Sequence, residues 1–189
     1  MPLSATEIIQ NVEEIFSLYD KYGNEDYGEN ITQLMHMVQS ANYARQEGAN
    51  DELVLAAFLH DIGHFIESER MDIYGKQHHD KLGGQYLLNL GFPERMAKLV
   101  SSHVDAKRYL TYKKPNYYDQ LSVASKMTLK YQGGPMDATE AAAFEADPLQ
   151  EFYIKIRHWD DLGKDQDVPV AKEDINQLKA LMITYLTQQ

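Results

Sequence analysis

The chain has 189 residues, 43% of them hydrophobic and 25% charged, which is enough apolar material for one core, so we expect a single domain over residues 1–189. The formal net charge of -11 argues against nucleic-acid and anionic-membrane partners, because both need a basic face. Since there is no cysteine, disulfide scaffolds, iron–sulfur clusters and thiolate zinc sites are excluded, and a metal site would use His, Asp and Glu.

The longest apolar run, Leu53 to Leu59, is far shorter than the roughly 20 residues that a membrane-spanning helix needs. The first residues carry no secretory signal, so we expect a cytoplasmic protein with no membrane partner and no obligate protein partner. The charge is uneven, because residues 98–164 hold ten Lys and Arg against nine Asp and Glu while the rest is acidic. A small anionic ligand can therefore find a locally basic site in this segment.

Helical spacing of apolar residues recurs along the chain, and we find no alternating strand pattern, internal repeat or low-complexity segment. Ser4 with Glu7 and Asp137 with Glu140 form capping boxes, which mark two helix starts. We expect some eight helices, and the nine candidate segments are 5–19, 34–48, 51–59, 79–91, 92 onwards including His103, 117–131, a short segment after Asp137, 148–158 and 172–187. Residues 20–30 lack periodicity, and residues 22–30 are a candidate lid loop.

A set of histidines and aspartates is spread over these helices at long intervals. His60 and Asp61 close an apolar helix, where burying an imidazole and a carboxylate is costly unless they have a partner. Long spacings mean that each ligand comes from its own helix, so the sequence predicts a metal site inside a helical bundle, and nitrogen ligands favour iron, manganese or zinc. The candidate ligands are His36, which we expect in mid-helix, His60, Asp61, His79, His103 and Asp160.

In this order the six residues resemble the HD-domain superfamily, whose pattern is H…HD…D with further histidines where a second metal is bound. The segments His60–His64, His103–Leu110, Tyr131–Asp137 and Lys155–Asp160 are similar to the organophosphonate dioxygenases of that family, and this likeness extends from about residue 26 to 164. The resemblance implies an all-α HD-domain helical bundle with a buried dinuclear site. It also implies two iron ions, a mixed-valent Fe(II)/Fe(III) pair bridged by Asp61, with O2 as co-substrate.

The activity that the resemblance implies is O2-dependent cleavage of the C–P bond of a small organophosphonate. The substrate would be a 1-hydroxy-2-(trimethylammonio or amino)ethylphosphonate, and the products glycine betaine or glycine plus phosphate. His64 and Lys107 would be catalytic, and Lys107 is one helical turn from His103, on the same face. A phosphonate dianion needs cations and hydroxyl donors, and the implied contacts are His64, Lys107, Ser125, Thr128, Gln132 and Arg157.

The cationic end of such a substrate would be recognised by the loop before the first histidine ligand. The resemblance implies Asp26, Tyr27 and Glu29 for this role, and Glu29 lies seven residues before His36. Met35 stands where the family has an acidic residue, so the chain departs from the family near the headgroup. A primary ammonium and a trimethylammonium group both remain open.

Two other functions are compatible with the same residues. An HD phosphohydrolase of a nucleotide or small phosphate ester would use the same ligands to activate water, with Lys107 and Arg157 binding phosphate. A non-catalytic sensor would keep the site but turn nothing over. Dependence on O2 separates the oxygenase from the hydrolase.

His78 and His158 receive no role in either function. For any single Lys or Arg, a position on the surface is commoner than a position in a binding site.

Overall fold

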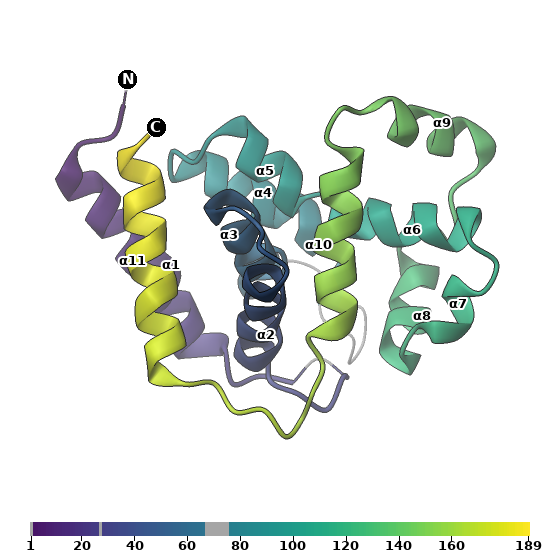
Figure 1. Ribbon diagram of the computed structural model, residues 1–189, viewed down its shortest axis with the longest axis horizontal. Helices are drawn as coiled ribbons and strands as arrows, with labels where there is room; N and C mark the ends of the chain where they lie inside the picture. Colours follow the sequence, from purple (N-terminus) through teal and green to yellow (C-terminus); the bar gives the residue numbers. More distant parts are fainter. Residues whose placement is uncertain (1, 27, 67–75) are drawn as a thin grey trace.

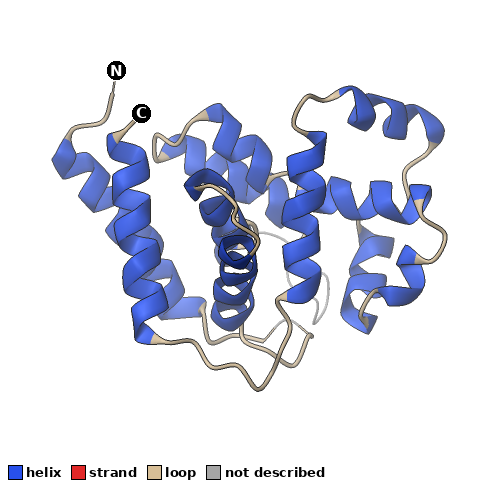
Figure 2. Cartoon of the chain, in the orientation of Figure 1, coloured by secondary structure: helices blue, strands red, loops and turns tan. Residues whose placement is uncertain are grey.

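In the computed structural model, residues 2–26, 28–66 and 76–189 are described, and they fold as a bundle of helices (Figures 1 and 2). Across these ranges there is no strand, and Asp26 and Thr32 form an isolated β-bridge. The all-α prediction is therefore confirmed. The described residues form eleven α-helices and one 3-10 helix, which is more than the expected eight.

The helices lie close to the predicted ranges. In chain order they are α1 (Ala5–Tyr22), α2 (Gln33–Gln46), α3 (Asp51–Leu59), η1 (Ile62–Phe65), α4 (His79–Asn89), α5 (Glu94–Val100), α6 (His103–Lys113), α7 (Tyr117–Gln120), α8 (Val123–Tyr131), α9 (Ala138–Ala146), α10 (Gln150–Leu162) and α11 (Lys172–Thr187). Among the described residues we find no helix with the length and hydrophobicity of a membrane-spanning segment.

Helix α3 is the centre of the core. Each residue from Leu53 to Leu59 is buried, which explains why this segment is apolar on all sides. It packs against α2, α5, α10 and α11, so its C-terminal end, with His60 and Asp61, is enclosed by other helices. The burial of α3 therefore places an imidazole and a carboxylate in the interior of the bundle.

Helices α1 and α11 cover one end of the molecule, where both chain termini lie (Figure 1). The capping box of Ser4 and Glu7 begins α1, as predicted, and Ile8, Val12 and Ile15 of its apolar face are buried. Helix α10 crosses the middle of the bundle and packs against both α2 and α6. It thereby joins the N-terminal half of the fold to the α6–α9 end.

Two expected helices are each divided in two, and in both cases a serine is at the break. The helix expected from residue 92 ends at Val100, and His103 begins the separate helix α6. The Ser102 hydroxyl donates to the Leu99 carbonyl at 2.7 Å, which satisfies an acceptor at the end of α5. Likewise, Ser122 caps α8 by accepting the Ser125 N–H at 3.0 Å, so residues 117–131 are not one helix.

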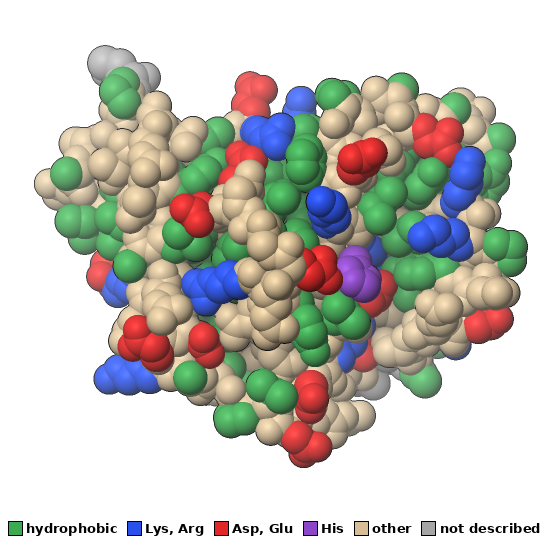
Figure 3. Space-filling model, viewed as in Figure 1, with side chains coloured by type: hydrophobic (Ala, Val, Ile, Leu, Met, Phe, Trp, Pro, Cys, Tyr) green, Lys and Arg blue, Asp and Glu red, His purple; other side chains and the backbone are tan. Residues whose placement is uncertain are grey.

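The first predicted loop is shorter than expected. Helix α1 continues to Tyr22, so the first residue of the candidate lid is helical, and Tyr27 lies outside the described residues. His36 is in the first turn of α2 rather than in mid-helix, because α2 begins at Gln33 after the Thr32 cap. On the face shown in Figure 3, Lys and Arg are mixed with Asp and Glu.

Candidate metal centre

One group of side chains capable of holding a metal lies between α2, the end of α3 and α10. The His36 Nε2 atom is 3.1 Å from His60 Nε2 and 3.4 Å from Asp160 Oδ1. Asp61 Oδ2 is 3.5 Å from His36 Nε2 and 3.4 Å from His60 Nε2. His36, His60 and Asp160 can therefore hold one metal ion, with an Asp61 oxygen beside them.

A second group is formed at the N-terminal ends of α4 and α6. The His79 Nε2 atom is 3.0 Å from His103 Nε2, and these two nitrogens lie 3.4 and 3.3 Å from Asp61 Oδ1. His64 Nε2 is somewhat farther from the same oxygen, at 3.8 Å. Asp61, His79 and His64 satisfy the geometry of a metal-capable group, and His103 contacts the same carboxylate oxygen.

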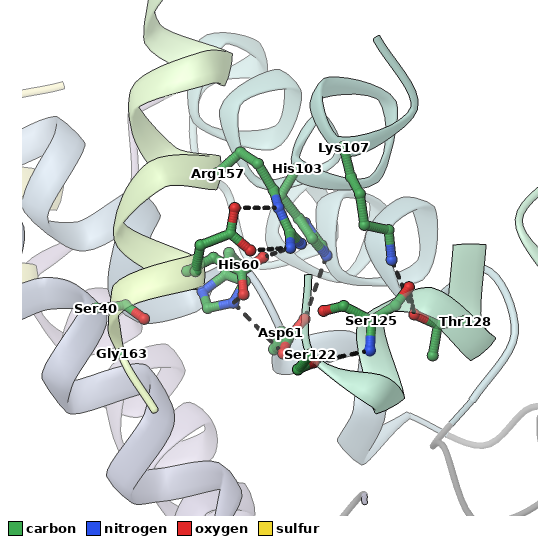
Figure 4. A network of polar contacts seen from close by, with 12 residues as sticks. Ser40, His60, Asp61, His103, Lys107, Ser122, Ser125, Thr128, Arg157 and Gly163 are labelled. Atoms are coloured by element: carbon green, nitrogen blue, oxygen red, sulfur yellow. Dashed lines mark hydrogen bonds and ion pairs between the residues drawn. The ribbon is translucent and has the colours of Figure 1, made fainter. Parts of the chain in front are cut away.

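Asp61 links the two groups. Its Oδ2 atom faces His36 and His60, whereas its Oδ1 atom faces His79 and His103. Figure 4 shows Asp61 lying between His60 and His103. A carboxylate with one oxygen in each group has the arrangement of a ligand shared by two metal ions.

The four imidazoles that face Asp61 share one orientation. In each of them Nδ1 lies within hydrogen-bond distance of a backbone carbonyl, which can only accept, so Nδ1 carries the proton and the lone pair is on Nε2. The Nδ1-to-carbonyl distances are 2.7 Å for His36 to Gly163, 2.7 Å for His60 to Ala57, 3.0 Å for His79 to Lys76 and 3.0 Å for His103 to Val100. Such bonds fix the tautomer of metal-binding histidines.

The donor set fits cations. Two Nε2 lone pairs that face each other at 3.0–3.1 Å repel unless a positive charge lies between them. Burial raises the pKa of Asp61, but the neighbouring imidazoles, His60 foremost, hold it well below its usual range. Burial lowers the pKa of His36, whereas the carboxylates of Asp160 and Asp61 raise it to about 9. The carboxylates thus favour a positive charge at the point where the nitrogen lone pairs converge.

Two glycines allow the helices to approach closely around the groups. A Cβ on Gly63 would lie 1.8 Å from the His79 carbonyl oxygen, so only glycine lets η1 pack against the start of α4. A Cβ on Gly163 would lie 2.5 Å from Ser40 Oγ and 3.0 Å from the His36 carbonyl oxygen. Gly163 thus brings the end of α10 onto α2, where its own carbonyl accepts the His36 Nδ1 proton.

A pocket with an empty volume of about 390 Å³ opens onto both groups. All six residues predicted to contact a phosphonate line it, together with Glu29 and Lys164. The lining residues are Glu29, Asp61, His64, His79, His103, Val104, Lys107, Ala124, Ser125, Thr128, Gln132, Arg157, Asp160 and Lys164. Side chains from distant parts of the sequence are therefore brought together in one place.

A model of the HD domain matches residues 34–149, more than half of the chain. The chain belongs to the HD-domain family. This HD-domain protein is 42% identical over 161 residues to [1-hydroxy-2-(trimethylamino)ethyl]phosphonate dioxygenase (glycine-betaine-forming) of Leisingera caerulea, covering 83% of this chain and 82% of the relative. It is 36% identical over 163 residues to hydroxymethylphosphonate dioxygenase of Gimesia maris, covering 82% and 79%.

The same HD-domain protein is 41% identical over 187 residues to an uncharacterised protein of Acanthamoeba polyphaga mimivirus, covering 96% of this chain and 84% of that relative. The similarity to two proteins named as phosphonate dioxygenases confirms the branch that the motifs predicted. These relatives and the buried His and Asp groups also support metal binding.

Lys107 is the most buried ammonium group of the pocket in this HD-domain protein. Its side chain reaches from α6 towards α8, and Nζ donates to Thr128 Oγ1 at 2.8 Å (Figure 4). Only 3% of the residue is exposed. Burial, and then repulsion by Arg157, lower the pKa of Lys107 to about 7. In the described part of the structure no carboxylate is hydrogen-bonded to Lys107, so its ammonium form can interact with an anion.

Arg157 is held on three sides. Its Nη1 donates to Asp160 Oδ2 at 2.7 Å, its Nη2 donates to Asp161, and its Nε donates to the Tyr117 hydroxyl at 2.9 Å. The Tyr117 hydroxyl in turn donates to Asp161 Oδ2 at 2.6 Å. These contacts fix the guanidinium plane at the edge of the pocket and tie it to Asp160.

His64 and Gln132 offer further polar atoms. The backbone N–H of Lys76 donates to His64 Nδ1 at 3.1 Å, so the proton of the neutral ring is on Nε2, unlike in the other four histidines. Burial, and then the charge of His79, hold the pKa of His64 well below its usual value. The buried Gln132 Oε1 atom has no hydrogen-bond partner among the described residues, so this acceptor can receive a hydrogen bond from a ligand, whereas a phosphonate oxygen would be bound by the NH2 group of the same amide.

The residues expected at the headgroup are only partly brought to the pocket. Glu29 lines it, but Asp26 is exposed, accepts the Gly28 N–H at 2.6 Å and is not part of the lining. Sequence reasoning missed Lys164, whose Nζ donates to Glu29 Oε1 at 2.7 Å. Helical spacing does not reveal this residue, because α10 ends at Leu162 and Lys164 follows the helix.

Proposed function

We propose that this protein uses O2 to cleave the C–P bond of a 1-hydroxy-2-(trimethylammonio or amino)ethylphosphonate. The products are glycine betaine or glycine, together with phosphate. In the balanced reaction the C1–H and C1–P bonds break, and one oxygen atom is added to carbon and one to phosphorus. Carbon is oxidised by four electrons, O2 is reduced by four electrons, and one proton is released.

One observation carries this proposal: members of both metal-capable groups and a set of donors suited to a phosphonate line the same pocket. The relatives add the reaction class, because two of them are named as phosphonate dioxygenases. A phosphohydrolase would need the same ligands and cations, but neither of these named relatives is a hydrolase.

The cofactor we propose is a pair of iron ions in the mixed-valent Fe(II)/Fe(III) state. Bound iron would supply the one-electron chemistry that O2 needs in order to react with a C–H bond. Asp61 would be the shared ligand, because one of its oxygens faces each group. The remaining ligands would be His36, His60 and Asp160 for one ion and His79 and His103 for the other.

The chain's own residues bind and orient the phosphonate. Lys107 and Arg157 would supply the positive charge, and Ser125, Thr128 and Gln132 the neutral hydrogen bonds. His64 Nε2–H would donate to an oxygen at the phosphonate end, and the low pKa of this buried ring keeps it neutral. His64 belongs to the second metal-capable group and Lys107 lines the same pocket, so we assign these two residues the catalytic contacts.

Phosphate release tests the proposal. Protein reconstituted with iron is incubated with each of the two hydroxyphosphonates, with O2 and under strict anaerobiosis, and phosphate and the carboxylate product are quantified. We expect both products in equal amounts, and only with O2. Phosphate released from simple esters without O2, and none from the phosphonates, would instead identify a phosphohydrolase.

A further inference from the structure

The pocket contains a third cationic side chain, Lys164, whose position no family motif named above explains. Its Nζ atom donates to Glu29 Oε1 at 2.7 Å and to Ser125 Oγ at 3.1 Å. Glu29 also accepts the Ser122 hydroxyl at 2.8 Å. The side chains of Lys164 and Glu29 are 17% and 8% exposed, so this ion pair is largely shielded from water. Both residues line the pocket.

We propose that Lys164 is a specificity-determining residue, because its ammonium group occupies the place at Glu29 that a cationic substrate headgroup would take. Lys164 comes from the segment after α10, and Glu29 from the loop before α2, so the pair joins two segments at the pocket. A cationic headgroup has to displace Lys164 before it can reach the carboxylate. A substrate with an uncharged substituent leaves the pair intact.

The chemistry of the pair ranks the headgroups. A primary ammonium group can donate hydrogen bonds to Glu29. It therefore replaces the hydrogen bond that Glu29 loses when Lys164 is displaced. A trimethylammonium group has no N–H and interacts with Glu29 through its charge alone. The charge-assisted hydrogen bond between Lys164 and Glu29 is then lost without replacement. The ion pair therefore lowers the affinity for a trimethylammonium headgroup most.

The inference rests on the proposed function, since it assumes that the pocket binds phosphonates, but it can be tested without turnover. Ethylphosphonate, 2-aminoethylphosphonate and 2-(trimethylammonio)ethylphosphonate lack the C1 hydroxyl group and are not substrates of the proposed reaction. Their dissociation constants are measured by calorimetry on the iron-loaded protein without O2. Phosphate release from the hydroxylated compounds is measured separately, so a failure of the reaction and a failure of this inference are distinguished.

We expect Lys164→Met to shift the affinity ratio of the trimethylammonio compound to ethylphosphonate by at least about tenfold in favour of the cation. Glu29→Gln should shift the same ratio in the opposite direction, and Lys164→Arg should keep the wild-type ratio. Lys130→Met removes the same charge from α8 outside the pocket lining and is the matched control.

The proposal would be overturned if the affinity ratio in Lys164→Met stayed within about twofold of the wild-type ratio. It would also be overturned if Lys164→Met and Glu29→Gln shifted this ratio in the same direction. If Lys164→Met does not fold by circular dichroism, Lys164→Gln and Glu29→Gln provide the same comparison. If the wild-type protein binds none of the three phosphonates, this inference is wrong, and the separate phosphate assay on the hydroxylated compounds decides the proposed function.

Discussion

Asp61 is the residue on which a dinuclear centre depends most, because its carboxylate contacts the imidazoles of both groups, which no other carboxylate of the described residues does. In Asp61→Asn one oxygen becomes an NH2 group, which cannot bind a metal ion. We expect the iron content to fall from about two ions to one or fewer per chain, and the rate of phosphate release to fall by at least about 100-fold. Metal analysis after dialysis and a phosphate assay measure the two effects.

Asp51→Asn is the matched control for this variant, since Asp51 is an exposed carboxylate in the first turn of α3. It should keep the wild-type iron content and rate. If Asp61→Asn retained two tightly bound iron ions per chain, the shared-ligand assignment would be wrong.

Lys107 gives a prediction about pH. Burial and Arg157 lower the pKa of Lys107 to about 7, the other charged groups that act on it being Asp160, Lys164 and Asp161. The ammonium form, which attracts a phosphonate dianion, is present below pH 7 and is lost as the pH rises through that value. The contribution of Lys107 to binding should therefore decrease above pH 7, by up to about tenfold for each pH unit.

The comparison of Lys107→Met with wild type isolates this effect, because the titration of the phosphonate itself is the same in both proteins. We expect the ratio of their dissociation constants for ethylphosphonate to be at least about tenfold at pH 6 and several-fold smaller at pH 8.5. A ratio that is constant over this range would show that the charge of Lys107 does not titrate there.

At the scale of the elements, the proposed ligands lie near helix ends. His79 and His103 are the first residues of α4 and α6, His60 follows the last residue of α3, and Asp160 is in the last turn of α10. The last carbonyls of a helix have no intrahelical partner. His60 and His103 use such carbonyls, of Ala57 in α3 and Val100 at the end of α5, to fix their rings.

The break between α5 and α6 therefore has a function that periodicity does not reveal. Apolar spacing predicted one helix through His103, because the pattern continues across the two serines. In a continuous helix the Val100 carbonyl would accept the N–H four residues later and would not be available to His103. The ligand could be predicted from its residue type and order, whereas its orientation depends on a hydrogen bond that a sequence pattern does not contain.

Gly163 offers a test of this element-level arrangement. In Gly163→Ala the new Cβ atom would meet Ser40 Oγ and the His36 carbonyl, so the end of α10 must move away from α2. His36 Nδ1 then loses its carbonyl partner, and loss of such a partner typically weakens metal binding by about 10- to 100-fold. Competition with a chelator of known affinity measures the change.

The double variant Ser40→Ala with Gly163→Ala is the control for this prediction. It removes the closest contact, at 2.5 Å, and leaves the contact of 3.0 Å with the His36 carbonyl. We expect metal affinity to recover in part. Wild-type affinity in Gly163→Ala alone would contradict the role of this carbonyl.

For the molecule as a whole, the all-α class and the set of residues around the pocket could be predicted from residue type, order and family resemblance. The ion pair of Glu29 and Lys164 could not, because its partners are 135 positions apart and each has an ordinary surface residue type. The same holds for Arg157 and Tyr117, which are 40 positions apart. Pairs of this kind depend on how the helices pack, and local patterns do not encode that packing.

Removing the metal should weaken the entire fold, because the proposed ligands come from α2, α4, α6, α10 and the end of α3. Without cations, the buried carboxylates and lone pairs face one another at 3.0–3.9 Å and hold these helices together less well. A ligand that binds the native state, at a free concentration about 1,000 times its dissociation constant, raises the melting temperature of a protein of this size by about 10 °C. We therefore expect chelation to lower it by about that amount and added iron to restore it, as measured by calorimetry at constant pH. In Asp61→Asn, which should already lack much of the metal, chelation should have a much smaller effect; equal shifts in both proteins would show that the stabilising metal lies elsewhere.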